Sequence, residues 1–411
     1  MILRQCTYNS EEILMSNGIE GASPNQSQPV RDALFEQTIE LPSWAFGNSG
    51  TRFKVFSTPG TPRDPFEKVA DAAQVQRFTG VTPRVSLHIP WDLVDDFVAL
   101  GEYAAGCGVS IGVINSNVFQ DDDYKLGSLT NADARIRDKA VRHHLDCLGV
   151  MRATGSKSLK IWLGDGLNYP GQGDLRQRQE WLSEGLRTIY DAMDPDQQLL
   201  LEYKLFEPGF YSTDVPDWGT SLLHCLELGD RAKVVLDTGH HAPGTNIEFI
   251  VMQLLRQGRL GAFDFNSRFY ADDDLMVGAA DPFQLFRIMH EIVLADALRA
   301  DSGVNFMLDQ CHNIEQKIPG EIRSAMNVQE ATAKALLVDQ PALTAAQMDG
   351  DVLGAYGVLK DAYDTDVRDL LAEIRVAKGL DPDPMRAFLA SGYLEKTAAE
   401  RVGGTQAGWG A

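Results

Sequence analysis

Four short apolar runs between residues 199 and 310 each end in an acidic residue, and this repetition constrains the fold more than any other feature. The clearest run is KVVLDTGHH, which delivers Asp237 and then His240. The pattern recurs in LLLEYK, GAFDFN and NFMLDQ, which carry Glu202, Asp264 and Asp309. Such runs are typical of buried parallel strands, and a buried carboxylate is costly unless a cation or hydrogen bonds satisfy it. The four acids therefore predict one shared site.

Strand-like runs alternate with helix-like segments along most of the chain. Two of the helices begin with the same capping pattern, Asp64 before Pro65 and Asp281 before Pro282, and a third is expected from Asp92 to about Cys107. The strands are expected near residues 52, 85, 110, 158, 198, 233, 260 and 304. Eight such units predict an α/β fold, a closed (β/α)₈ TIM barrel. An open doubly wound sheet is the alternative, but no strand is followed by the dinucleotide fingerprint GxGxxG.

The barrel is expected over residues 51–350, between two helical extensions. Residues 1–50 form an N-terminal extension with one short helix against the body, and residues 351–411 form a C-terminal helical extension that packs on the barrel or on a neighbouring subunit. Right-handed crossovers place the carboxyl ends of all strands at one mouth of the barrel. The acids therefore converge where barrel enzymes hold their active sites.

The charge balance excludes several partners. With 37 basic and 58 acidic residues the formal net charge is −21, which repels nucleic acid and anionic membrane surfaces. The five cysteines are scattered without a CxxC pair, as in proteins of reducing compartments. No signal peptide and no apolar run of about 18 residues is evident, so a cytoplasmic location is expected.

Residue types at the predicted mouth favour a metal centre. Glu202 and Lys204 are two residues apart and face the same side, while Asp272 and Asp274 lie on the loop after Asp264. The candidate metal ligands are Glu202, Asp237, His240, Asp264, Asp272, Asp274 and Asp309. Oxygen ligands with one imidazole suit Mn²⁺, Mg²⁺ or Co²⁺, and seven ligands suit two ions that share a carboxylate. Asp273, between two candidates, is interpreted as a helix cap or a solvated loop charge.

Other residues near the strand ends are weaker candidates. His88, four residues before Asp92, could carry protons or be a structural histidine, and Trp162 could form a pocket wall or belong to the core. Asn115 follows a strand and could contact a sugar, together with Asn117 and Phe119. His241 and His312 sit beside candidate ligands. The loop GDGLNYPGQG is only a weak phosphate cradle, because no basic residue accompanies it.

The order and spacing Glu202-x-Lys204, Asp237-x-x-His240, Asp264, Asp272-x-Asp274 and Asp309 resemble the two-metal site of the xylose-isomerase-like superfamily. Within it, the segments HIPWD, ADDDL and GGTQAGWGA resemble the bacterial L-rhamnose isomerases of broad aldose range. The resemblance covers residues 30–411 and implies a homotetrameric aldose–ketose isomerase that uses two divalent ions. Mn²⁺ is the metal expected before others. Asp264 departs from it, since rhamnose isomerases carry a histidine there and xylose isomerases an aspartate.

The resemblance implies conversion of L-rhamnose to L-rhamnulose by a metal-mediated hydride shift between C1 and C2. Glu202, Asp237, Asp264 and Asp309 then hold one ion, and His240, Asp272 and Asp274 hold the second with a shared carboxylate, best assigned to Asp237. Asp274 thus stands beside the reacting oxygens. Lys204 stabilises the developing charge at O1. His88 assists ring opening, while Trp162 and Asn115 line the sugar site.

Three other activities compete with this interpretation. A ketose 3-epimerase shares the barrel but uses one ion and a pair of glutamates, whereas this chain has Lys204 and an aspartate at 309. A metal-dependent phosphodiester hydrolase would need a basic face, which the net charge of −21 argues against. A non-catalytic sugar-binding protein would need no metal pair.

Overall fold

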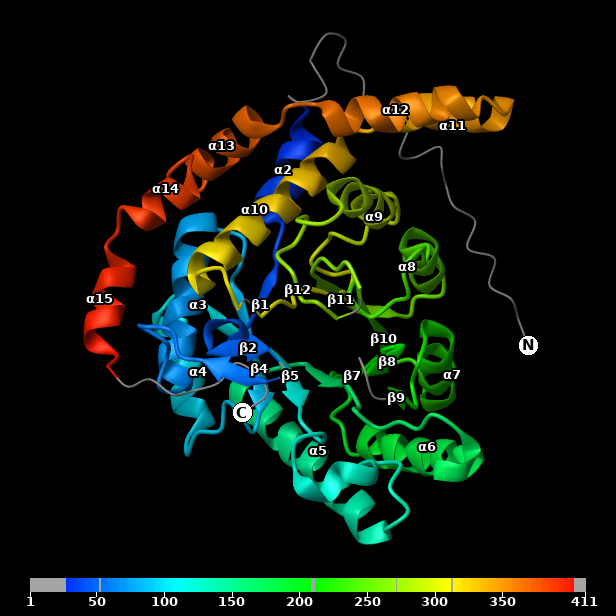
Figure 1. The fold of residues 1–411 in the computed structure, drawn as a ribbon. Helices are drawn as coiled ribbons and strands as arrows, with labels where there is room; N and C mark the ends of the chain where they lie inside the picture. The colour runs from blue at the N-terminus through cyan, green and yellow to red at the C-terminus, as the bar shows by residue number, and fades with distance from the viewer. Residues whose placement is uncertain (1–26, 52, 208–210, 271, 312, 403–411) are drawn as a thin grey trace.

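The computed structural model describes residues 27–402 except 52, 208–210, 271 and 312. Within them, eight parallel strands form a closed barrel in the order β1-β12-β11-β10-β7-β6-β5-β4 (Figure 1). These strands are β1 (Glu40–Pro42), β4 (Arg84–Ile89), β5 (Ser110–Ser116), β6 (Ser158–Ile161), β7 (Gln198–Glu202), β10 (Ala232–Asp237), β11 (Leu260–Phe265) and β12 (Asn305–Leu308). The predicted TIM barrel is confirmed.

The first barrel strand lies earlier than predicted. Glu40 of β1 pairs in parallel with Arg84 of β4 and with Met307 of β12, which closes the barrel. The run expected as the first strand near residue 52 instead forms a two-stranded antiparallel hairpin outside the barrel, β2 (Ser49–Thr51) with β3 (Lys54–Phe56). The expected barrel start at residue 51 is wrong in this respect, because the alternation in RFKVFS belongs to a solvated hairpin.

Helices surround the barrel, each following a strand. They are α3 (Pro65–Thr79), α4 (Phe97–Gly106), α5 (Ala134–Thr154), α6 (Leu175–Asp191), α7 (Trp218–Leu228), α8 (Ile247–Arg256), α9 (Pro282–Leu294) and α10 (Lys317–Leu336). Asp64 and Asp281 cap α3 and α9 as predicted, accepting from the amides of Glu67 and Gln284. The helix expected from Asp92 begins at Phe97, and Asp96 is its cap. Short 3₁₀ turns η2 (Ser43–Phe46), η3 (Asp122–Leu126) and η4 (Pro170–Gln172), and a small hairpin of β8 (Phe206–Glu207) and β9 (Tyr211–Ser212), lie between elements.

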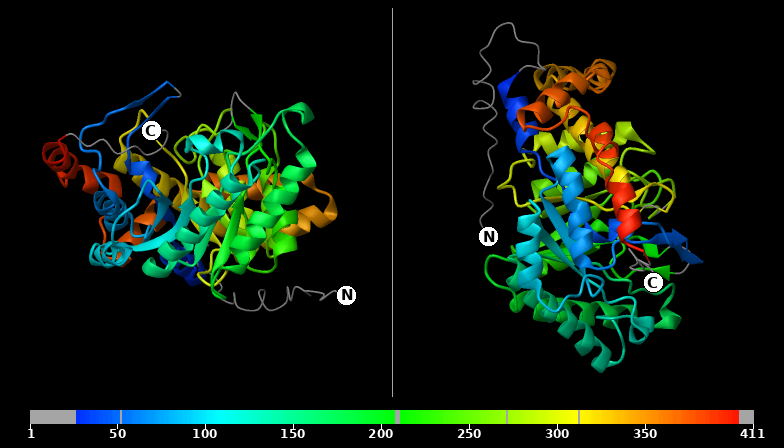
Figure 2. Two further views of the ribbon diagram at one scale, coloured as in Figure 1. Left: turned by 90° about the horizontal axis from the view of Figure 1, so that it is seen from below. Right: turned by 90° about the vertical axis from the view of Figure 1, so that its left-hand side faces the viewer.

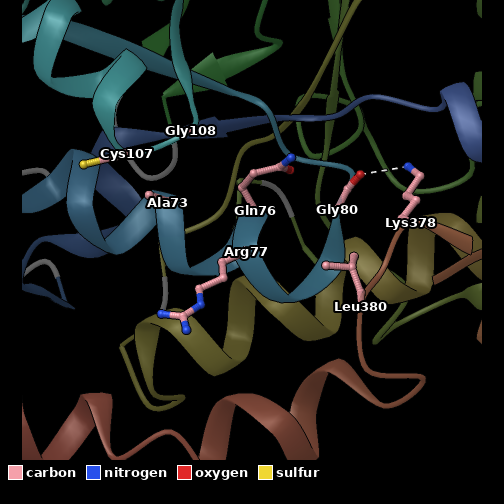
Figure 3. A pocket seen from close by; sticks show the side chains of 8 residues that line it. All are labelled: Ala73, Gln76, Arg77, Gly80, Cys107, Gly108, Lys378 and Leu380. Carbon is pink, nitrogen blue, oxygen red and sulfur yellow. Dashed lines mark hydrogen bonds between the residues drawn. The ribbon is translucent and has the colours of Figure 1, made fainter. Parts of the chain in front are cut away.

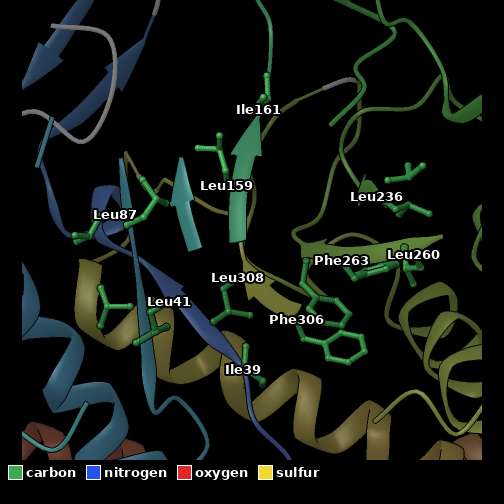
Figure 4. Packing of buried hydrophobic residues seen from close by; sticks show 14 of the residues in the cluster. Ile39, Leu41, Leu87, Leu159, Ile161, Leu236, Leu260, Phe263, Phe306 and Leu308 are labelled. Carbon is green, nitrogen blue, oxygen red and sulfur yellow. The ribbon is translucent and has the colours of Figure 1, made fainter. Parts of the chain in front are cut away.

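The apolar core of the barrel and its surrounding helices has two parts. The larger part fills the space between strands and helices and includes Leu41, Leu159 and Phe263 (Figure 4). A smaller cluster within the barrel consists of Val113, Leu200, Val235 and Ala262. Each of these four stands two residues before a polar residue on its own strand, namely Asn115, Glu202, Asp237 and Asp264. Because side chains two apart on a strand share a face, this cluster forms an apolar layer inside the barrel, directly beneath those polar groups.

The two extensions pack along one outer side of the barrel. The N-terminal helix α2 (Gln28–Glu36) buries Leu34 against α10 and α13 (Arg368–Ala377), as the predicted short helix should. The C-terminal helices are α11 (Gln340–Asp349), α12 (Val352–Asp364), α13, α14 (Pro384–Leu389) and α15 (Tyr393–Glu400). The last three run past α10 and α3 (Figures 1 and 2). No described helix is long and apolar enough to cross a membrane.

Candidate metal centre

The carboxyl ends of four adjacent strands bring four acids together. Glu202 ends β7, Asp237 ends β10, Asp264 lies next to the end of β11, and Asp309 follows β12. In register, Asp237 lies beside Asp264. One carboxylate oxygen from each of the four acids lies within 4.8 Å of the others. Buried oxygen ligands at this density suit a hard divalent cation.

Two further observations fit a cation at this cluster. Oδ1 of Asp264 is buried and has no hydrogen-bond partner among the described residues, so a ligand bond would satisfy it. Burial, reinforced by Asp237 and Glu202 and opposed by Lys160, raises the pKa of Asp309 to about 7. Burial likewise raises the pKa of Asp264 well above its usual range. The cluster therefore has more negative charge than its own residues neutralise, which is the condition a divalent ion relieves.

His240 joins this cluster through a second overlapping group. Donor atoms of Glu202, Asp237 and His240 also lie within 4.8 Å of one another. Nδ1 of His240 lies 3.0 Å from the carbonyl oxygen of Tyr203, and its Nε2 lies 2.9 Å from Oδ1 of Asp272. A donor bond from Nδ1 to the carbonyl makes Nε2, which faces Asp272, the nitrogen that could bind a metal. Burial lowers the pKa of His240, but the surrounding acids outweigh this and raise it to about 10.

The loop after β11 carries the remaining two candidate ligands in strained backbone. Asp272 and Asp274 have φ angles of 56° and 48°, a left-handed conformation that costs free energy in residues other than glycine. Asp272 is anchored by its amide, 3.1 Å from the carbonyl oxygen of Gly239. Neither Asp272 nor Asp274 belongs to the two close-packed groups found among the described residues. These two predicted ligands are therefore less closely assembled than the four strand-end acids. Asp273 accepts from the amides of Phe269 and Tyr270, so it stabilises the turn of this loop.

Asn266 orients the acid at the centre of both groups, and sequence reasoning missed it. Its Nδ2 donates to Oδ1 of Asp237 at 2.9 Å, and the amide of Gly239 donates to the same oxygen at 2.6 Å. The signal was available, because Asn266 stands two residues after Asp264 at the same strand end. These bonds fix Asp237, which belongs to both close-packed groups, as Glu202 also does.

Two lysines lie against the acids. Lys204 forms ion pairs with Asp272 and, at 2.9 Å, with Glu207, and its Nζ stands 4.9 Å from the centre of the Trp162 ring. Burial lowers the pKa of Lys204, yet Asp272 and Glu207 more than reverse this and raise it. Lys160, which sequence reasoning missed, pairs with Asp264 from the opposite side of the barrel. A lysine within the apolar run SLKIWLG was the available signal.

Aromatic rings form a wall beside the cluster. His88, at the end of β4, stacks on Trp91 with ring centres 3.8 Å apart and meets Trp44 and Phe119 edge-on. Phe119 contacts Trp162 at 4.6 Å. Burial first, and Lys68 next, lower the pKa of His88 well below its usual value, so its imidazole is neutral at pH 7. Trp44, also missed, donates from Nε1 to Oδ1 of Asp309 at 3.0 Å and so ties the wall to the acids.

The weaker candidates have different surroundings. Asn115 lies beside His88 in register and donates to the carbonyl oxygen of Leu87 at 3.0 Å. His241 lies 2.7 Å from the hydroxyl of Tyr203, and burial lowers its pKa to about 3. His312 lies outside the described residues. In the glycine-rich loop, Asp165 accepts four hydrogen bonds from Ser128 and Thr130, which is a structural role for the loop and not a phosphate cradle.

A surface hollow elsewhere offers no comparable chemistry. It lies at the C-terminal ends of α3 and α4, where the chain enters the amino ends of β4 and β5, and so at the other end of the barrel (Figure 3). Its lining is Ala73, Gln76, Arg77, Gly80, Cys107, Gly108, Lys378 and Leu380. Lys378 donates to the carbonyl oxygen of Gly80 across it at 2.8 Å. Without an acid or a histidine in the lining, the hollow is not a candidate metal site.

A (β/α)₈ barrel with a carboxylate and histidine cluster at its mouth defines a class of candidate metalloenzymes. Comparison with known proteins identifies the family within this class. No protein-family model matches the chain. A probable sugar isomerase of Rhizobium meliloti is 44% identical over 370 residues, 88% of this chain and 86% of the relative. One of Mesorhizobium japonicum is 43% identical over 90% of this chain and 88% of the relative. The chain therefore belongs to this family of probable sugar isomerases, within the xylose-isomerase-like TIM-barrel superfamily.

More distant similarities agree with this assignment. A xylose isomerase of Thermus thermophilus is 28% identical over 42% of this chain and 46% of its own length. Among solved structures, an L-ribulose 3-epimerase matches with a TM-score of 0.50 at 15% identity, over 77% of this chain and 98% of that one. A D-psicose 3-epimerase matches with a TM-score of 0.50 at 14% identity, over 77% and 100%. At these identities the structural matches establish the fold alone.

Proposed function

We propose that this protein is a divalent-metal-dependent aldose–ketose isomerase that converts L-rhamnose to L-rhamnulose and accepts related aldoses. The observation that carries the proposal is the convergence of Glu202, Asp237, Asp264 and Asp309, whose oxygens lie within 4.8 Å of one another at the barrel mouth. The sugar isomerase family supports the reaction class. The preference for L-rhamnose rests on the resemblance of the HIPWD, ADDDL and GGTQAGWGA segments, the last of which lies outside the described residues.

In this proposal the four strand-end acids bind one ion, and His240, Asp272 and Asp274 with Asp237 bind a second. Mn²⁺ is the first choice for this oxygen-rich set, with Co²⁺ or Mg²⁺ as substitutes. Two bound divalent ions would supply Lewis acidity at the two oxygens between which the sugar carbonyl moves. The orienting bonds from Asn266 to Asp237 and from His240 to the carbonyl of Tyr203 support this division.

The chain's own residues account for the remaining chemistry. Isomerisation moves one hydrogen from C2 to C1, one proton off O2 and one proton onto O1, so that nothing is gained or lost. Lys204, held protonated by Asp272 and Glu207, stabilises the charge that develops at O1. Neutral His88 accepts and returns a proton during ring opening, with Asn115 beside it toward the sugar. The wall that includes Trp162 and Phe119 excludes water from the reacting carbons.

The proposal also includes a homotetramer in the cytoplasm. Exposed apolar side chains on the C-terminal helices support assembly, since Met348, Val352 and Leu353 are 82%, 76% and 83% exposed in the single chain.

The deciding experiment incubates metal-depleted and Mn²⁺-reloaded protein with a panel of aldoses and, separately, of ketoses. We expect ketose from L-rhamnose with the reloaded protein only. Asp237→Asn, which removes the charge common to both sites, should bind less Mn²⁺ and lose turnover. Epimerised ketose without aldose would favour the 3-epimerase, and a reloaded protein that binds Mn²⁺ but converts no sugar would contradict an isomerase.

A further inference from the structure

A buried cation faces the proposed metal centre from across the barrel. Lys160 is the third residue of β6, lies beside Asn115 and Leu200 in register, and is 3% exposed. Its ammonium forms an ion pair with Asp264, which is fully buried. It also attracts Glu202 and Asp309 electrostatically. One fixed positive charge therefore stands among the four carboxylates that would hold an ion.

The pair divides the oxygens of Asp264 between two tasks. Oδ2 accepts from Lys160, while Oδ1 has no hydrogen-bond partner among the described residues. Asp264 can then give an ion one oxygen while its charge is offset by the ammonium. The pair thus carries no net charge.

We propose that Lys160 is a positioning residue that sets the charge of the metal centre by neutralising Asp264. This deepens the proposed function and rests on its metal site. When the four carboxylates are ionised, as metal binding requires, the ammonium of Lys160 brings the net charge of the group from −4 to −3. Like charges repel more strongly in a buried site, so the ammonium weakens binding of a divalent ion and keeps that ion exchangeable.

The test is a charge cycle read out by Mn²⁺ affinity in calorimetry and by metal content in elemental analysis. Lys160→Met should tighten the stronger Mn²⁺ site about 10- to 100-fold, the range in which residues that orient metal ligands act. Asp264→Asn should weaken it, since the ammonium then stands without its counter-charge. The double variant restores the wild-type net charge and should bind nearly as wild type does. The control is Lys157→Met, because Lys157 is exposed and lies directly before β6. This variant should leave the Mn²⁺ affinity unchanged.

Two further measurements complete the test: the Tm of Lys160→Met with and without Mn²⁺, and the Mn²⁺ affinity of Lys160→Arg. Lys160→Met leaves Asp264 buried without a cation, so its metal-free protein should melt lower than wild type and gain more in Tm from Mn²⁺. Lys160→Arg keeps the charge and should keep wild-type affinity. Unchanged or weaker Mn²⁺ binding by Lys160→Met, with wild type binding normally, would overturn the charge role alone. Absence of Mn²⁺ binding by wild type would overturn the metal centre and this inference together.

Discussion

The backbone amide of His88 donates a 2.7 Å hydrogen bond to Oδ2 of Asp92, four residues further along the chain. Oδ1 of the same carboxylate accepts from Nζ of Lys68 at 2.7 Å, and neither side chain of this ion pair is exposed. Ser43 also donates to it. Asp92 thus connects the strand end that carries His88 to helix α3 and to the turn that carries Trp44.

Removing this carboxylate should destabilise the barrel strongly. Asp92→Ala leaves the ammonium of Lys68 buried without a partner, so we expect a loss of roughly 3–5 kcal/mol in the free energy of unfolding. Glu373→Ala removes the acid of an exposed pair with Arg31 and should cost about 0–1 kcal/mol. Chemical denaturation measures both. Equal losses in the two variants would contradict a special role for the buried pair.

Local sequence patterns correctly predicted the features that depend only on residues close together in the chain. Asp64 and Asp281 predicted two helix starts because a cap needs only the next three residues. The acids that end strands predicted the shared mouth because all parallel strands point the same way. The first barrel strand was missed because Glu40–Pro42 is too short to show a period, whereas the alternation near residue 52 belongs to a hairpin.

Contacts between distant segments could not be read from the sequence. Asp92 and Asp96 both precede apolar helical spacing, and only the buried Lys68, in another helix, decides that Asp92 is an ion-pair partner and not a cap. Lys160 and Asp264 are 104 positions apart, so nothing local pairs them. Trp44 reaches Asp309 over 265 positions. The composition of the site was thus more predictable than its supporting contacts.

Replacing Lys204 should separate binding from turnover. Lys204→Met removes the cation at O1 and should lower turnover on the order of 10²–10³-fold. Both proposed ions should still bind, because the four strand-end acids do not depend on Lys204 and its removal leaves Asp272 to the second ion. Elemental analysis and steady-state rates make this comparison. Loss of bound metal would instead make Lys204 a structural partner of Asp272 alone.

The isotopic label should stay with the sugar. The described acids near the reacting carbons are committed to the proposed ions or to lysines, which leaves few free bases to carry a proton from C2. Aldose deuterated at C2 should therefore give ketose deuterated at C1, and the reaction in D₂O should incorporate almost no solvent deuterium, as NMR would show. Substantial solvent exchange would favour an enediol route with a free base.

The stability of the metal-free protein should fall as pH rises. The pKa of Asp309 is raised to about 7 by burial, and that of His240 to about 10 by the surrounding acids, so both hold protons more tightly folded than unfolded. The folded state thus loses stability from about pH 4 to 7 through Asp309 and from about pH 6.5 to 10 through His240. Mn²⁺ offsets the released charge, so the rise in Tm on adding Mn²⁺ should grow between pH 6 and 9. A constant rise across this range would count against the cluster as the binding site.

The end of the chain should stabilise its own barrel as well as any assembly. The apolar residues Phe388, Leu389, Tyr393, Leu394 and Trp409 predict a segment that is buried against the barrel or a partner. Phe388 is buried and meets Phe78 of α3 edge-on at 5.6 Å. Arg401 is paired with Asp71 of the same helix at 2.8 Å. Leu389 is 54% exposed, and Trp409 lies outside the described residues. Deletion after Gly379 should therefore lower the Tm of the barrel itself.

Assembly is better tested on α11 and α12, where Met348, Val352 and Leu353 are exposed. Leu353→Asp places a charge in an exposed apolar patch, so we expect the tetramer to dissociate in light scattering at micromolar concentration while the chain keeps its helical circular dichroism. Leu223→Asp, on the 64% exposed Leu223 of α7, is the matched control and should remain tetrameric. A wild-type protein that is monomeric at this concentration would refute the tetramer, and a tetramer unaffected by Leu353→Asp would place its interface elsewhere.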